Sequence, residues 1–326
     1  MAAVVVKSKV NKANKSRTSK GDLLFYICLL VLPLLQIAIF YFFVNVNSLL
    51  LPFKSFDGEK LVYDSNLPAF QRVYADFLSL PAFWSEVVSH SIVVYIFTSI
   101  VTAVLAIFFS YYIYKKRTAY KFFKFVLFLP SIIPSVLLVL MFKNFFQDAL
   151  PQYLNVFSGG AFLDESGFIS EAFRNKFVLA FNKDTAFAVI TAFNCWIGFG
   201  SQVLVYTGAM EQIPTEVIEA GKLDGANRFV EFFKIILPFV IPTLTTFIIT
   251  GIASMFVNQN NYFSFFGSDQ SYGSSYITVG YLLYNATDNI QKMDAFPEYS
   301  LLGILFTFIA VPLSLLARKL LKKASE

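Results

Sequence analysis

Charged residues are scarce in this sequence. Only 14% of its 326 residues are charged, whereas 56% are hydrophobic. Because an ordinary soluble domain carries about 25% charged residues, the composition excludes a soluble protein and indicates an integral membrane protein. The net charge of +5 does not indicate a nucleic-acid partner, since the charges lie in short clusters at the ends of apolar segments, as they do in membrane proteins.

Residue types for catalysis and metal binding are also scarce. The two cysteines, Cys28 and Cys195, lie within apolar segments, where we expect small buried side chains rather than a disulfide or a metal pair. The single histidine, His90, is expected at the membrane interface. Ser201 lacks the glycine two positions before it that an intramembrane serine protease would need, and the apolar segments hold no carboxylate for an aspartyl protease. We therefore expect no catalytic residue and no metal site.

The sequence also lacks a phosphate-binding loop of the form Gly-x-x-x-x-Gly-Lys-[Ser/Thr]. Its nearest approach is Gly221-Lys222, with Glu216 in place of the first glycine. We therefore expect the chain to bind no cofactor, and any ATP that drives it to lie on a separate subunit. Ion-driven transporters usually carry ionisable residues within their spans. Apart from Lys124 at the start of the third segment, only Lys143 lies within one here, and it is close enough to the end to reach the interface.

Long apolar segments dominate the remainder of the sequence. The first, 23–46, is longer than the core of a signal peptide and has no small-residue cleavage site after it, so it is expected to remain as a transmembrane helix. The others are 88–114, 122–146, 185–210, 235–257 and 300–316. Pro130 and Pro134 predict a kink or an unwound turn within the third. The expected fold class is an all-α integral membrane protein with six transmembrane helices.

Lysine and arginine predict the orientation of these helices. They are concentrated in the tail 1–22, the turn 115–121 and the tail 321–326, whereas the segments 47–87 and 258–299 carry more Asp and Glu. With six spans, the loop 211–234, which holds Lys222, Arg228 and Lys234, falls on the same side as the basic segments. Basic segments remain in the cytoplasm. Both termini and the loop 211–234 are therefore expected in the cytoplasm. Segment 47–87, with turns and a short helix, is expected outside the cell, before the membrane core 88–320.

The loop 211–234 has a distinctive helical pattern. Thr215 can cap a helix that runs to about Asp224, with Glu216 at its positive end. Gly225 is expected to end this helix, and a second helix is expected to restart near Ala226.

The residues on the two helices suggest how the loop packs. Four apolar residues of the second helix recur at helical spacing on one side, namely Phe229, Phe232, Phe233 and Ile236. Gly221 and Gly225 are four residues apart, which predicts a shared face that another surface can approach closely. The pattern fits either an amphipathic hairpin on the membrane or a docking element for a soluble partner.

This loop resembles a known motif. Glu219-Ala220-Gly221, three residues, Gly225, nine residues and Ile235-x-Leu237-Pro238 are similar to the EAA loop of ABC-importer permeases. Gly221 departs from the pattern, which has a second alanine there, and this lowers helix stability by about 1 kcal/mol. Leu223-Asp224-Gly225-Ala226 resembles the carbohydrate branch of that family, which includes maltose and glycerol-phosphate permeases. The resemblance covers the region from about Ala186 to the C-terminus.

The resemblance implies a permease core of the type I ABC-importer fold over 88–320, in a multi-pass protein of the cell membrane. It implies a second permease subunit, expected to be a different chain, two ATPase subunits that bind the ATP, and an extracellular solute-binding protein. The loop would form a coupling helix seated in the ATPase. The residues assigned to coupling are Glu216, Glu219, Ala220, Gly221, Asp224, Gly225 and Arg228. Alternatives are a permease for another small solute and a passive channel or assembly subunit.

Amide side chains near the fourth and fifth apolar segments suggest a path for the solute. The candidate pathway residues are Asn194, Gln202, Asn258, Asn261 and Tyr262, with Gln259 and Asn260 beside them. Amides can donate to and accept from sugar hydroxyls, and aromatic faces suit sugar rings. About half of these residues are expected to form interhelical hydrogen bonds instead, and the end of the fifth segment could be a helix cap followed by a polar loop. Together with the carbohydrate-branch resemblance, the amides favour a sugar or oligosaccharide.

Overall fold

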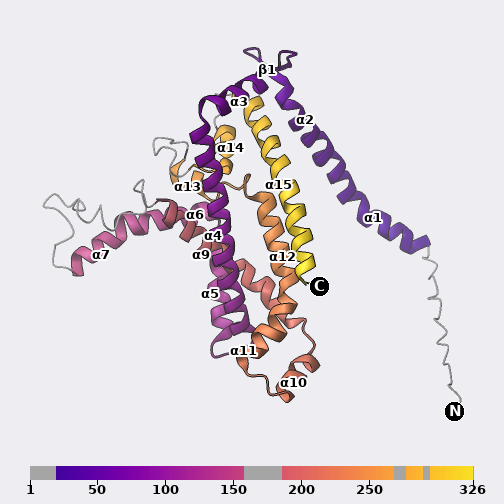
Figure 1. Ribbon diagram of the computed structural model, residues 1–326, viewed down its shortest axis with the longest axis vertical. Coiled ribbons are helices and arrows are strands. Elements are labelled where there is room, and N and C mark those ends of the chain that lie inside the picture. Colours follow the sequence, from indigo (N-terminus) through magenta and orange to yellow (C-terminus); the bar gives the residue numbers. More distant parts are fainter. Residues whose placement is uncertain (1–19, 158–185, 268–276, 289–293, 326) are drawn as a thin grey trace. The chain divides into compact units, whose positions relative to one another are not determined.

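The computed structural model describes residues 20–157, 186–267, 277–288 and 294–325 (Figure 1). The basic tail 1–22 lies almost entirely outside these residues, as does much of the segment between the third and fourth expected spans. The chain divides into two compact units, Met1–Leu50 and Leu51–Glu326, and each is described by itself.

The first unit is a single apolar helix. It consists of α1 (Lys20–Gln36), the π-helical stretch η1 (Ile37–Val44) and α2 (Asn45–Leu50). Its large apolar side chains are exposed, which is typical of a helix surface that contacts lipid. The unit supplies most of the apolar segment Leu24–Phe53, whose 30 residues are enough to cross a membrane. This agrees with the first span expected from the sequence.

The second unit begins with a cap of short elements. They are η2 (Leu51–Phe53), β1 (Lys54–Phe56), β2 (Leu61–Tyr63) and α3 (Pro68–Ser79). The strands pair antiparallel, with Ser55 opposite Val62. At the turn between them, Asp57 Oδ1 accepts the N–H groups of Glu59 and Lys60, each at 3.1 Å, and these bonds hold the pKa of Asp57 below its ordinary value. The sequence predicted turns and a short helix here but not the hairpin, because three-residue strands leave too short a pattern.

Four long helices form the body of the second unit. They are α4 (Pro81–Tyr114), α9 (Ala186–Glu211), α12 (Leu237–Ser254) and α15 (Phe296–Ser325). Helix α4 packs along α9, and α12 packs along α15 (Figure 1). Helix α4 begins at Pro81 rather than Val88, because proline suits the first turn of a helix. Helix α15 continues through the basic tail to Ser325, so both helices extend beyond their apolar segments.

The third apolar segment is broken in two. Helices α5 (Tyr120–Ile132) and α6 (Ser135–Asn144) meet at an angle of 99°, which confirms the kink predicted from Pro130 and Pro134. Within the described residues, 5 helices are long and apolar enough to cross a membrane, and the bent pair makes 6 if it forms one broken span. After α6 the chain continues through η3 (Phe145–Ala149) and α7 (Leu150–Phe157).

Lys143 of α6 binds the protein itself. Its Nζ is half-buried and donates to the carbonyl oxygen of Phe265 at 2.9 Å. We had expected this lysine to reach the membrane interface. The carbonyl is available because Phe265 lies in the last turn of the short helix α13 (Tyr262–Phe266). Carbonyl groups in the last turn of a helix have no partner within that helix.

Helices α5 and α9 are in backbone contact. A Cβ added at Gly200 of α9 would overlap the carbonyl oxygen of Leu127 in α5. Helix α4 is tied to α9 in a different way, since Ser110 Oγ donates to the carbonyl oxygen of Val203 at 2.9 Å. These contacts join three membrane helices through backbone and hydroxyl groups.

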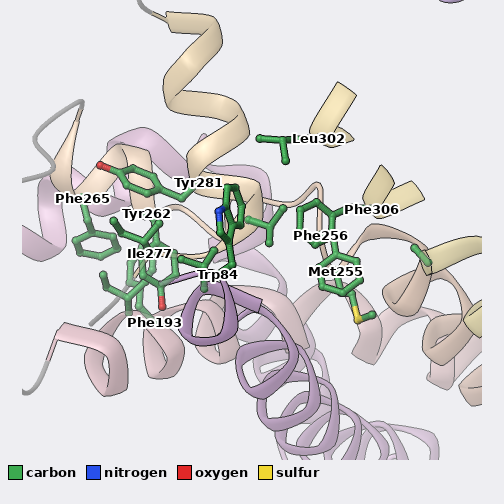
Figure 2. Close-up of a cluster of buried hydrophobic side chains, with 14 of the residues drawn as sticks. Trp84, Phe193, Met255, Phe256, Tyr262, Phe265, Ile277, Tyr281, Leu302 and Phe306 are labelled. Carbon is green, nitrogen blue, oxygen red and sulfur yellow. The ribbon is translucent and has the colours of Figure 1, made fainter. Parts of the chain in front are cut away.

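Buried apolar side chains form two clusters in the second unit. We call the first the aromatic cluster (Figure 2); it includes Trp84, Phe193, Met255, Phe256, Tyr262, Phe265, Ile277, Tyr281, Leu302 and Phe306. We call the second the loop-side cluster; it consists of Ala106, Ile107, Ile113, Phe199, Val203, Tyr206, Met210, Ile213, Ile218, Ile236 and Val240. The aromatic cluster also includes Val279 of α14 (Val279–Asp288).

Candidate functional site

The loop 211–234 contains the helix predicted from its pattern. Helix α10 spans Thr215–Leu223, with Glu216 in its first turn and Lys222 in its last, where each charge favours the helix dipole. The prediction that Thr215 caps this helix was wrong. Pro214 is the N-cap, with φ −56° and ψ 134°, because a proline already has a suitable φ and has no N–H that would need a partner.

Helix α10 ends at Gly225 in a closed hydrogen-bonded motif. Gly225 has φ +77°. The N–H of Ala226 donates to the carbonyl of Gly221 at 3.0 Å, and the N–H of Gly225 donates to the carbonyl of Lys222 at 3.1 Å. This is a Schellman motif, in which a left-handed residue satisfies the last carbonyls of a helix. The predicted break at Gly225 is therefore confirmed.

The two glycines of this loop have different roles. Gly225 lies beyond the end of α10, so the prediction that it shares a face with Gly221 was wrong. No described atom lies within 4 Å of the position that a Cβ would take at Gly225, so this glycine is required by its backbone angle. At Gly221, in contrast, a Cβ would overlap Cδ1 of Ile235. The close approach at Gly221 is therefore made within the chain.

Helix α10 is anchored on the membrane helices through its inner side. Ile218 is buried in the loop-side cluster, together with Ile213 before the helix and Ile236 after it. With the contact between Gly221 and Ile235, this packing fixes α10 against the segment that follows the loop. Of the two arrangements left open by the sequence, a hairpin resting only on the membrane does not account for these contacts.

The second helix of the loop restarts later than expected. Helix α11 (Arg228–Val230) begins after Asn227, whose Oδ1 accepts the N–H of Val230 at 2.9 Å. It continues into the π-helical stretch η5 (Glu231–Ile236) and then into α12. The sequence analysis places the restart near Ala226, two residues earlier. Asparagine is a strong N-cap residue, so Asn227 is the sequence signal for the later start.

The residues assigned to coupling lie mainly on the outer side of the loop. All except the half-buried Gly221 are exposed, namely Glu216, Glu219, Ala220, Asp224, Gly225 and Arg228. Two large apolar residues flank the Gly225 turn and are also exposed, Leu223 at 89% and Phe229 at 76%. Phe229 and Phe233 are exposed whereas Ile236 is buried, so the four apolar residues predicted to lie on one side of the second helix do not form one buried surface. The sequence analysis also missed Leu223.

A polar pocket lies between α4, α9 and α12. Its volume is about 250 Å³. The lining residues are Tyr95, Thr98, Ser99 and Thr102 of α4, Gly198 and Gln202 of α9, Phe247, Thr250, Gly251 and Ser254 of α12, and Met255, Asn258 and Asn260 after it. Among these described residues none is charged, and nine of the thirteen carry a hydroxyl or an amide, although most of the surface that lines the pocket is apolar. A Cβ at Gly251 would lie 2.5 Å from the Tyr95 ring, so the missing side chain leaves room for Tyr95, whose O–H donates to the carbonyl of Ile248 at 2.8 Å.

The predicted pathway residues divide into two groups. Gln202 and Asn258 line this pocket. Asn194 is buried, with 8% of its surface exposed. Its Nδ2 donates to the carbonyl oxygen of Asn260 at 2.7 Å, and its Oδ1 accepts Nδ2 of Asn261 at 2.6 Å. These are hydrogen bonds between segments of the protein, which the sequence analysis expected for about half of the amides.

Tyr262 belongs to the aromatic cluster rather than to the pocket lining. It is completely buried among the rings shown in Figure 2. Burial raises the pKa of its phenol, so the side chain stays neutral. The structure thus brings Gln202, Asn258 and Asn260 together at the pocket and places Asn194, Asn261 and Tyr262 behind it.

The turn 258–261 is held by its own amides. Asn260 and Asn261 have φ values of 50° and 61°, in the left-handed region that asparagine tolerates better than most residues. Asn258 Oδ1 accepts the N–H of Asn260, and Gln259 Oε1 accepts the N–H of Phe263, both at 2.9 Å. This turn therefore ends the fifth helical segment and forms part of the pocket wall at the same time.

Comparison with known proteins places this geometry in a family. The model of the family described as "Binding-protein-dependent transport system inner membrane component" matches residues 99–324, more than half of the chain. The maltose/maltodextrin transport system permease protein MalF of Salmonella typhimurium is 29% identical over 194 residues, which cover 58% of this chain and 34% of MalF. MalF of Escherichia coli K12 is 29% identical over 136 residues, which cover 42% of this chain and 24% of that protein. The chain thus matches about a third or less of the length of these curated relatives.

Two solved structures share the fold. One is a bacterial ABC transporter involved in the import of the acidic polysaccharide alginate, with a TM-score of 0.67 and 14% identity over 94% of this chain and 98% of that chain. The other is a bacterial alginate ABC transporter in complex with alginate pentasaccharide-bound periplasmic protein. Its TM-score is 0.66, with 16% identity, and the match covers 94% of this chain and 96% of that chain. At this identity the likeness establishes the fold of a type I importer permease. From the family match, this chain belongs to the inner-membrane components of binding-protein-dependent transport systems.

Proposed function

We propose that the chain is a permease subunit that imports a neutral sugar or oligosaccharide, driven by ATP hydrolysis on separate subunits. The observation that carries this proposal is the lining of the pocket between α4, α9 and α12. It combines six hydroxyl side chains with three amides, and none of the described lining residues is charged. Such groups can exchange hydrogen bonds with the hydroxyls of a sugar, whereas an acidic or basic solute would call for an opposite charge.

The size of the pocket limits what it holds. Its volume of about 250 Å³ is below the roughly 300–1,000 Å³ of pockets for drug-sized ligands. It therefore admits one end of an oligosaccharide rather than the whole chain. The absence of charge in the described lining favours a neutral sugar, as in the maltose permeases, over an acidic polysaccharide such as alginate.

The loop supports the proposed coupling to an ATPase. Helix α10 is fixed to the membrane core on one side, and it exposes acidic residues and the apolar side chain of Leu223 on the other. A leucine that is 89% exposed in a cytoplasmic loop is best explained by a partner that covers it. We propose that this partner is an ATPase subunit, and that a second permease and an extracellular solute-binding protein complete the assembly, as the periplasmic protein does in the alginate complex.

Uptake of radiolabelled sugars by the assembled transporter in proteoliposomes tests the proposal. Gln202→Ala and Asn258→Ala should lower uptake at limiting sugar, while assembly and basal ATP hydrolysis remain. Ser201→Ala is the matched control, because Ser201 neighbours Gln202 but is exposed outside the pocket. ATP-dependent uptake of an amino acid or a metal ion instead of a sugar would exclude the sugar assignment. Uptake that needs no ATP would favour a passive channel.

A further inference from the structure

An ion pair joins two distant parts of the chain beside the loop. Lys115 Nζ, at the end of α4, pairs with Glu231 Oε1, at the start of η5. The two residues are 116 positions apart, and only 20% and 7% of their side-chain surfaces are exposed. The sequence analysis used Lys115 only as one of the basic residues that predict orientation.

Aromatic rings enclose the pair. Lys115 Nζ lies 5.7 Å from the ring centroid of Tyr111 and 5.6 Å from that of Tyr114, and so interacts with both ring faces. The ring of Phe232 lies 4.9 Å from that of Tyr111. The backbone N–H of Glu231 donates to the carbonyl of Asn227 at 2.8 Å, which fixes the residue at the start of its helix.

A buried ion pair is not explained by stability alone. The cost of removing two charges from water can offset their attraction, so apolar residues of similar size often stabilise a protein as well. What such a pair adds is a fixed geometry, because a buried charge is stabilised by the opposite charge placed directly beside it. Here the geometry that is fixed is the position of the end of α4 relative to the first turns of the helix that continues into α12.

Both helices lead to the polar pocket. Thr102 of α4 and Phe247 of α12 line it, and each lies roughly 20–25 Å along its helix from the ion pair, at 1.5 Å per residue. On the other side of the pair, η5 contacts α10 through Ile235 and Gly221. The pair therefore lies where the loop meets the two helices that form opposite walls of the pocket farther along their length.

We propose that Lys115 and Glu231 are a positioning pair that transmits displacement of α10 to α4, so that both walls of the pocket move together. This inference rests on the proposed function, in which an ATPase moves α10. Without the pair, α10 would still displace α12, to which it is connected through η5, but α4 would follow less closely, because it would be joined to the loop only by the apolar packing of the loop-side cluster, to which Ile113 and Ile236 both belong. ATP hydrolysis would then continue while less solute is moved for each ATP.

The experiment measures solute transported per ATP hydrolysed by the complete transporter in proteoliposomes. In Glu231→Gln and Lys115→Met this ratio should fall about fivefold or more, the lower end of usual coupling factors, while the ATPase still co-purifies. The double variant Lys115→Glu with Glu231→Lys should recover part of the ratio. Lys116→Met is the matched control and should retain the full ratio, because Lys116 is the exposed cation next to Lys115.

A variant without unpaired charge separates coupling from folding. Lys115→Met with Glu231→Met leaves no buried charge without a partner and should assemble normally, yet its ratio should be low. A full ratio in this double variant, or in both single variants, would overturn the inference. If the unmodified transporter neither binds an ATPase nor shows ATP-dependent uptake, the proposed function itself fails. If the unmodified transporter is coupled and the variants keep its full ratio, the proposed function stands and only the role of the ion pair fails.

Discussion

The loop after α9 and the turn after α12 both reverse the chain with left-handed residues, but with different residue types. The loop uses Gly225 at φ +77°, and the turn uses Asn260 and Asn261 at φ 50° and 61°. Glycine adopts this conformation without steric cost and has no side chain that needs a partner. In the turn, the amides of Asn261 and its neighbours bond to the protein itself.

The side chains around Gly225 in the loop are exposed and can contact a partner, whereas the side chains of the turn stabilise the backbone of the turn itself. In the turn, most amides support the backbone, and only Asn258 and Asn260 also line the pocket. Two turns that share a left-handed backbone therefore differ in function, and four experiments test this contrast, from the largest expected effect on the readout to the smallest.

The largest effect should be in accessibility. In a cysteine-free background, a single cysteine at Thr118 should resist an impermeant thiol reagent in intact cells, whereas one at Ser65 should react completely. Thr118 lies in the basic turn after α4, on the same side as the loop, and Ser65 lies beside the β1–β2 hairpin. Both positions are exposed. Labelling at Thr118 from outside would reverse the orientation and place the loop away from any cytoplasmic ATPase.

Gly225→Leu should cause a nearly complete loss of ATPase co-purification. Leucine at φ +77° costs about 1–2 kcal/mol, which would open the Schellman motif and release α10 from its position. Gly225→Asn is the control, because asparagine tolerates the left-handed region, and it should retain most of the binding. If the two variants lose binding equally, the site requires a small side chain rather than a backbone angle.

Gly221→Leu should have an intermediate effect that can be reversed within the chain. The new side chain would overlap Ile235, and overpacking of this kind costs about 1–3 kcal/mol. Adding Ile235→Ala should recover part of the melting temperature and of the coupled ATP hydrolysis. The absence of any recovery would mean that Gly221 faces a partner protein rather than Ile235.

Asn194→Ala should affect transport the least and stability more. It leaves the Asn260 carbonyl and the Asn261 amide without their buried partner, which costs about 1–3 kcal/mol, and the melting temperature should fall. Uptake by the assembled fraction should change less than it does in Asn258→Ala, whose side chain lies at the pocket. If Asn194→Ala lost as much uptake as Asn258→Ala or more, Asn194 would belong to the solute pathway.

The sequence predicted features that depend on local pattern. Apolar length predicted the spans, Pro130 and Pro134 predicted the bend between α5 and α6, and Gly225 predicted the end of α10. The sequence did not predict features that depend on the packing of distant segments. Thr98 and Thr102 are unremarkable threonines until α4 meets α9, and Lys115 has no visible partner until Glu231 is placed beside it. Asn194 and Gln202 lie about two turns apart on α9, and the amide pattern does not specify which of them lines the pocket.

The backbone contact between Gly200 and Leu127 restricts the motions open to the transporter. Turning α9 about its axis by one residue, roughly 100°, would bring Phe199 or Ser201 to the Leu127 carbonyl, where even a Cβ at Gly200 has no room. Helices α5 and α9 are therefore expected to rotate together rather than independently. Spin labels on α5 and α9 should accordingly keep a constant separation through every nucleotide state.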